Sequence, residues 1–85
     1  MYKILSIKQG GVDRLDGRYP LRIGCIGDIM NLESGFCMLF AYTTDQNGNP
    51  KEGVLRTSIV KDWRLENRCV IVNTLNSEYV LEELT

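Results

Sequence analysis

Short runs of Val, Ile, Leu, Phe and Tyr recur along the chain, and clusters of Gly, Asn, Asp and Pro separate them. No run keeps a helical period, and runs of this length bounded by turn residues are typical of β-strands. The pattern predicts strands at 2–7, 19–32, 36–44, 54–65 and 68–74, with a last strand or a short terminal turn at 78–84. Five or six short antiparallel strands must curl to bury one face of each. We therefore expect an all-β fold, a small SH3-like barrel forming a single domain over residues 1–85.

Turn residues set the connections between these strands. Gly24 and Gly27 predict a bulge or a sharp bend inside the second segment. The stretch 45–50, DQNGNP, predicts a hairpin turn, and Glu66-Asn67 predicts a tighter one.

The stretch 73–77, NTLNS, places polar residues between two apolar runs. It predicts a corner joining the last two strands, in which Asn76 and Ser77 cap the turn through bonds from side chain to backbone. The alternative is a ligand-facing polar cluster, a small-molecule pocket bordered by Thr74, Asn76 and Ser77.

Two segments break the alternation of apolar and polar residues that a strand with one buried face shows. Both alternating sets of FCMLFAY (36–42) are apolar, and so are both sets of CVIV (69–72). By contrast, Leu55, Thr57, Ile59 and Trp63 share one side of a nearly regular strand, in which a bulge would accommodate Val60.

The two doubly apolar segments carry more apolar surface than one small barrel interior can hold. In one interpretation, bent strands and the loop 9–18 cover the excess. In the other, the excess is a docking surface for a second copy of the chain or another protein. The residues predicted for that surface are Phe36, Met38, Leu39, Phe40 and Tyr42.

Composition narrows the classes of function. Ten Lys and Arg against eleven Asp and Glu give a net charge of −1, so no global field attracts nucleic acid or an anionic membrane. No apolar run has the length of a membrane span, and the N-terminus does not have a signal-peptide pattern. The three cysteines form no CxxC pair, and their odd number suits a reducing compartment. We expect a cytoplasmic protein.

Candidate chemistry is sparse. The chain has no histidine, so serine and cysteine have no suitable base, and a metal site would depend on scattered thiolates. The stretch 45–49 begins like a calcium loop, but Pro50 stands where that loop requires Gly. We expect no enzyme activity, no cofactor and no metal.

Nucleic-acid binding is the alternative to protein binding, because arginines and an aromatic residue occur in two segments. The residues predicted for it are Arg18, Arg22, Trp63, Arg64 and Arg68. Asp62 and Glu66 are interleaved with the second group and offset its charge, so nucleic acid is the less favoured partner.

The segments RTSIV (56–60) and VNTLNSEY (72–79) resemble a TSxV…TxNSxY pattern found in small uncharacterised bacterial proteins, and RYPLRIG (18–24) is similar to theirs as well. The resemblance covers about half of the chain. It implies a small cytoplasmic barrel and implies no activity.

Overall fold

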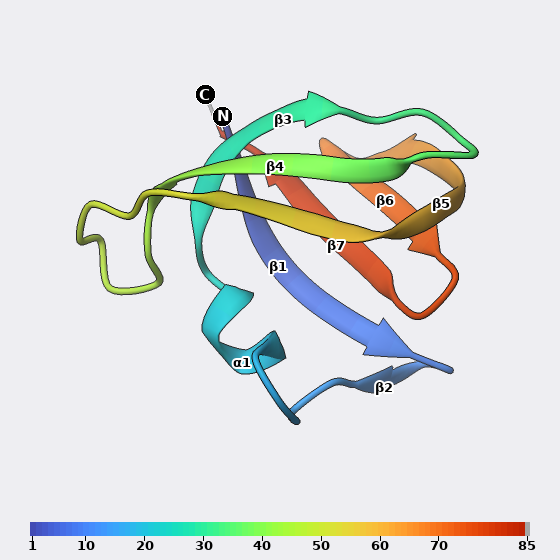
Figure 1. Ribbon diagram of the computed structural model, residues 1–85, viewed down its shortest axis with the longest axis horizontal. Coiled ribbons are helices and arrows are strands. Elements are labelled where there is room, and N and C mark those ends of the chain that lie inside the picture. Colours follow the sequence, from blue (N-terminus) through green and yellow to red (C-terminus); the bar gives the residue numbers. More distant parts are fainter. Residues whose placement is uncertain (85) are drawn as a thin grey trace.

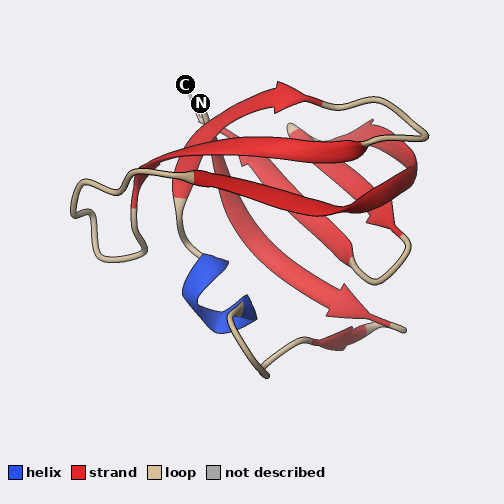
Figure 2. Cartoon of the chain, in the orientation of Figure 1, coloured by secondary structure: helices blue, strands red, loops and turns tan. Residues whose placement is uncertain are grey.

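The computed structural model describes residues 1–84, and antiparallel strands make up most of the chain (Figures 1 and 2). The elements in chain order are β1 (Tyr2–Gln9), β2 (Val12–Asp13), α1 (Tyr19–Arg22), β3 (Ile26–Asn31), β4 (Cys37–Thr44), β5 (Val54–Glu66), β6 (Cys69–Thr74) and β7 (Glu78–Glu83). The strands form one sheet in the order β2-β1-β3-β4-β5-β6-β7, and β1 also pairs with β7. The sheet therefore closes on itself. The all-β class is confirmed, and an SH3-like arrangement is consistent with this closed sheet.

The strand predicted at the start of 19–32 is wrong, because Tyr19–Arg22 forms the short helix α1. Pro20 lies in the first turn of that helix, where its fixed φ is favourable and its missing N–H is not needed. Gly24 then adopts a φ of +90°, the bend that the sequence predicted, and β3 begins at Ile26. Figure 1 shows α1 beside β1, below the first half of β5.

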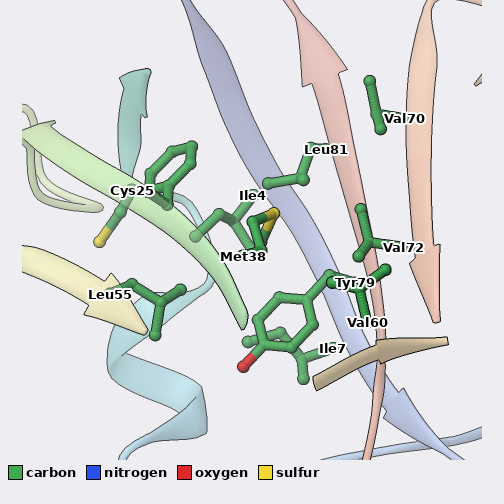
Figure 3. Packing of buried hydrophobic residues seen from close by; sticks show 11 residues of the cluster. Ile4, Ile7, Cys25, Met38, Leu55, Val60, Val70, Val72, Tyr79 and Leu81 are labelled. Carbon is green, nitrogen blue, oxygen red and sulfur yellow. The ribbon is translucent and has the colours of Figure 1, made fainter. Parts of the chain in front are cut away.

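The buried side chains of the core come from β1, β4, β5, β6 and β7, together with Cys25, and Ile29 of β3 packs against them (Figure 3). Completely buried side chains include Ile4, Ile7, Met38, Phe40 and Leu81. Tyr19 and Ile23 from the α1 region pack against this cluster, so the segment between β1 and β3 helps to close one end of the barrel. Within residues 1–84, no helix is long and apolar enough to cross a membrane.

Strand β5 carries two irregularities that decide which side chains face outward. Against β4, Arg56 pairs with Leu39 but Ile59 pairs with Cys37, so β5 holds one extra residue between these pairs. Against β6, a second shift falls between Val60 and Asp62. The bulge predicted near Val60 is thus present, and Val60 is buried. Ile59, however, faces outward and is 43% exposed, so its predicted place beside Leu55 and Thr57 is wrong.

Candidate binding surfaces

The structure divides the predicted docking residues between two sides of β4. Met38 and Phe40 are fully buried in the core, so they form no part of a surface on the folded protein. Leu39 faces outward between Asn31 and Arg56 and is half-buried. Phe36 precedes β4 and is 56% exposed. Tyr42 is half-buried, with its ring edge-to-face against Phe40 at 5.8 Å between centroids.

The outward side of β4 forms an apolar strip with its neighbour β5. Cys37, Leu39 and Ala41 point outward in succession and are half-buried. Val54 pairs with Ala41, and Ile59 pairs with Cys37, and both are exposed. These five residues are called the outer apolar face below.

The second doubly apolar segment, in β6, is covered by the chain itself. Val70 and Val72 face the core, and Ile71 faces the opposite side between Arg64 and Val80. Ile71 is nevertheless buried, so the apolar excess of β6 leaves no exposed surface. Within the loop 9–18, which one interpretation placed over the apolar excess, β2 pairs with β1.

A groove of about 360 Å³ lies between the α1 region and the first half of β5. Its lining contains four cationic side chains and no acidic one: Arg18, Leu21, Arg22, Tyr42, Lys51, Val54, Leu55 and Arg56. It is called the basic groove below. It combines the predicted Arg18 and Arg22 with Arg56 and with Lys51, which the sequence analysis did not single out.

Tyrosine rings hold two of these cations in place. The Nη1 atom of Arg22 donates a hydrogen bond to the Tyr79 hydroxyl at 3.0 Å, and its guanidinium carbon lies 4.9 Å from the Tyr19 ring centroid. The Nζ atom of Lys51 lies 4.8 Å from the ring centroid of Tyr42. Burial raises the pKa of the hydroxyls of Tyr79 and Tyr42, so both are neutral at pH 7 and add no negative charge to the groove.

The other residues predicted for nucleic acid do not line the basic groove, and the two arginines among them lie beside acidic groups. Arg64 Nε lies 3.1 Å from Glu66 Oε2. Arg68 lines a separate hollow with Glu82 and Glu83. Trp63 pairs with the buried Val72, so it lies on the opposite side of β5 from Arg64.

The stretch NTLNS forms the corner between β6 and β7. The Thr74 hydroxyl accepts a hydrogen bond from Ser77 N–H at 3.0 Å and donates one to the Ser77 carbonyl, also at 3.0 Å. Thr74 therefore caps the turn where the sequence predicted Asn76 and Ser77. A hollow of about 340 Å³ adjoins this turn, with Thr74, Asn76 and Ser77 among its lining residues. Of these residues, Thr74 already uses its hydroxyl in the two hydrogen bonds to Ser77.

The three cysteines are free thiols, with Cys25 buried and Cys37 and Cys69 half-buried. Burial raises the pKa of the Cys25 thiol, and its Sγ donates a hydrogen bond to the Leu21 carbonyl at 3.2 Å. A thiol of this kind acts as a small apolar side chain and not as a nucleophile. Among residues 1–84, no three His, Cys, Asp or Glu side chains are placed to hold a metal ion together.

These features define a small all-β protein with a closed sheet, an apolar outer face and a basic groove that adjoins this face at Val54. Comparison with protein-family models, curated proteins and solved structures finds no match to the chain. Its function is therefore argued from the geometry of these surfaces.

Proposed function

We propose that the protein is a non-catalytic binding module that acts through protein–protein contact, with a second copy of the chain as the partner at the outer apolar face. The observation that carries the proposal is the row Cys37, Leu39 and Ala41, which are successive outward positions on β4 and all apolar. Val54 and Ile59 widen this row on β5 and are 54% and 43% exposed. Burying such a surface against a partner removes apolar area from water.

The charges beside the outer apolar face favour a second copy. Asp28 of β3 pairs with Ala41 on one flank, and Arg56 of β5 pairs with Leu39 on the other flank. A two-fold axis parallel to β4 would lay β3 of one copy over β5 of its partner. Asp28 would then lie near both edges of the interface over β5 of the second copy, offset from Arg56 by the two residues that separate Ala41 from Leu39. Such opposite charges on the two flanks give the self-complementarity that a two-fold contact requires.

A cytoplasmic location and the lack of catalysis belong to the same proposal. The three free thiols support a reducing compartment. The absence of histidine from the sequence supports a role in binding, because general acid–base work at neutral pH relies most often on that residue.

Sedimentation equilibrium over a concentration series up to about 1 mM, where even a weak dimer is populated, tests the proposal. The unchanged chain is expected to reach the mass of a dimer. Leu39→Lys is expected to remain a monomer, because two lysines would meet near the two-fold axis. Ile59→Lys, at a more exposed position, is expected to weaken the dimer.

The matched control is Leu75→Lys, since Leu75 is 61% exposed in the β6–β7 turn and lies away from the outer apolar face. This variant is expected to dimerise like the unchanged chain. A monomeric mass for the unchanged chain at every concentration, or an equal loss in all three variants, contradicts the proposal.

A further inference from the structure

Four of the ten Lys and Arg residues of the chain line the basic groove, although the net charge is −1. Within the described residues, none of the four forms an ion pair; the pairs there are Met1–Asp28, Arg14–Asp16 and Arg64–Glu66. Cations elsewhere in the sheet have acidic neighbours, as Lys8 pairs with Glu78 and Lys3 with Glu82. The basic groove is thus a local concentration of positive charge with no acidic side chain in its lining, and Asp45, which attracts Lys51, lies outside that lining.

We propose that the basic groove binds a short polyphosphate, either free or as the phosphate chain of a nucleotide. Three guanidinium groups and one ammonium match the charge of a di- or triphosphate, and guanidinium groups bind phosphate oxygens through two parallel hydrogen bonds. The four like charges repel one another, so a bound anion relieves that repulsion. The volume of the groove, about 360 Å³, lies within the range of pockets that bind small ligands.

The aromatic side chains favour recognition of phosphate over recognition of bases. The ring of Tyr19 has the guanidinium carbons of Arg14 and Arg22 at 4.1 and 4.9 Å from its centroid. The ring of Tyr42 is covered by Lys51. Binding of single-stranded nucleic acid uses aromatic faces on which bases stack, and these rings already carry cations.

The distribution of charge also favours a small anion over a nucleic-acid strand. A strand needs a positively charged track that continues over several nucleotides. Beyond the groove, Arg64 is bonded to Glu66 and Arg68 lies with Glu82 and Glu83, so no such track extends to the β5–β6 hairpin. The site therefore has the extent of one short phosphate chain.

Isothermal titration calorimetry with sodium tripolyphosphate at low ionic strength tests this site. Arg18→Gln/Lys51→Gln removes two cations of the groove, and Arg64→Gln/Arg68→Gln removes two cations outside it. The groove variant is expected to bind about tenfold more weakly or worse, since each lost contact is a charge-assisted hydrogen bond. The control variant is expected to stay within about twofold, because it loses only long-range attraction.

Thermal unfolding of each variant checks that the fold is intact, and Arg18→Gln alone, at an exposed position, is the second variant if the double one unfolds. This single variant is expected to weaken binding several-fold. Arg56 is left unchanged because it also flanks the outer apolar face, so neither variant alters the surface proposed for self-association, and the titrations are run at a protein concentration where the chain is a monomer. Equal losses in the groove and control variants, or no heat of binding at millimolar tripolyphosphate, would overturn the proposal.

Two further titrations identify the source of the phosphate. ATP that binds as well as tripolyphosphate supports a site for the phosphate chain alone, and ATP that binds more tightly supports a nucleotide as the ligand. Single-stranded oligonucleotides of increasing length are expected to bind weakly and without dependence on length. An affinity that rises with each added nucleotide would overturn the proposal in favour of a nucleic-acid strand.

Discussion

The hydroxyl of Thr57 accepts a hydrogen bond from the backbone N–H of Met38 at 3.0 Å and donates one to the Ser58 carbonyl at 2.7 Å. This pair lies where β5 holds its extra residue against β4, so a side chain supplies an acceptor at a point where the backbone ladder is irregular. Because of this bulge, Ile59 faces outward beside Cys37 and completes the outer apolar face. The buried hydroxyl of Thr57 thus supports the bulge that places Ile59 on the outer apolar face.

Thr57→Val is expected to lower the free energy of unfolding by about 1–3 kcal/mol, because the N–H of Met38 would stay buried without a partner. Chemical denaturation followed by fluorescence measures the change. Thr43→Val is the control: Thr43 is an exposed residue of the same pair of strands, and its change is expected to stay within about 0.5 kcal/mol. Similar losses in the two variants would show that the hydroxyl of Thr57 has no special role.

Local patterns in the sequence predict most of the strands, because alternation and turn residues act over a few positions. These patterns place a turn only to within about one residue. In the hairpin at 66–69, the turn residues with positive φ are Asn67 and Arg68, one position later than the predicted Glu66-Asn67. The outward position of Ile59 was missed for a related reason. A bulge shifts every later residue to the other side of the strand, and the alternation within 55–59 does not show where it begins. The first residue to show the shift is Val60, one position after Ile59.

The basic groove depends on contacts between distant segments, which no local pattern contains. Arg22 and Lys51 come together because the sheet closes and the α1 region and the start of β5 line the same groove. The sequence contains one signal, RYPLR (18–22), in which two arginines flank a proline, but the apolar pattern predicts a strand from Tyr19 onward. The proline in the first turn of a helix was the feature that would have corrected this assignment.

Gly27 of β3 pairs with Tyr42 of β4. A side chain at Gly27 would overlap the Ala41 carbonyl and approach the Phe40 ring to 2.9 Å. Gly27→Ala is therefore expected to cost about 1–3 kcal/mol or more, since neither the partner strand nor the core ring can move freely. Thermal or chemical unfolding measures the loss. Asp28→Ala, one residue along the same strand, removes an exposed pair with the N-terminus at 3.8 Å and, at a protein concentration where the chain is a monomer, is expected to cost less than about 1 kcal/mol. A Gly27→Ala protein as stable as the control would contradict the close approach.

The corner between β6 and β7 gives opposite expectations for two neighbouring polar residues. Thr74→Val keeps the shape of the side chain but removes the hydroxyl that bonds both the N–H and the carbonyl of Ser77. This buried loss is expected to cost about 1–3 kcal/mol. Asn76→Ala, at an exposed position, is expected to change stability by less than about 0.5 kcal/mol. Denaturant titration of both variants measures the difference, and the reverse order would restore Asn76 as the cap.

The buried hydroxyl of Tyr79 is expected to make the free energy of unfolding depend on pH in the alkaline range. Burial raises the pKa of its hydroxyl in the folded protein above the ordinary value of 10, although the nearby Arg22 acts in the opposite direction. Below about pH 10 the phenol is neutral in the folded and unfolded chains, and its contribution to stability is complete. As the pH rises further, the unfolded chain releases this proton more readily than the folded one. Stability is therefore expected to fall from about pH 10 until the folded pKa is passed.

Melting temperatures of the unchanged chain and of Tyr79→Phe between pH 8 and 12 test this linkage. The variant is expected to be less stable at neutral pH, because Arg22 loses its bond to the hydroxyl, and to lose less stability as the pH rises. Burial raises the pKa of Tyr42 as well, so Tyr42→Phe is expected to flatten the curve in the same direction, and the double variant is expected to be flattest. If Tyr79→Phe keeps the full alkaline slope, other groups cause the loss, and the buried hydroxyl of Tyr79 is not its source.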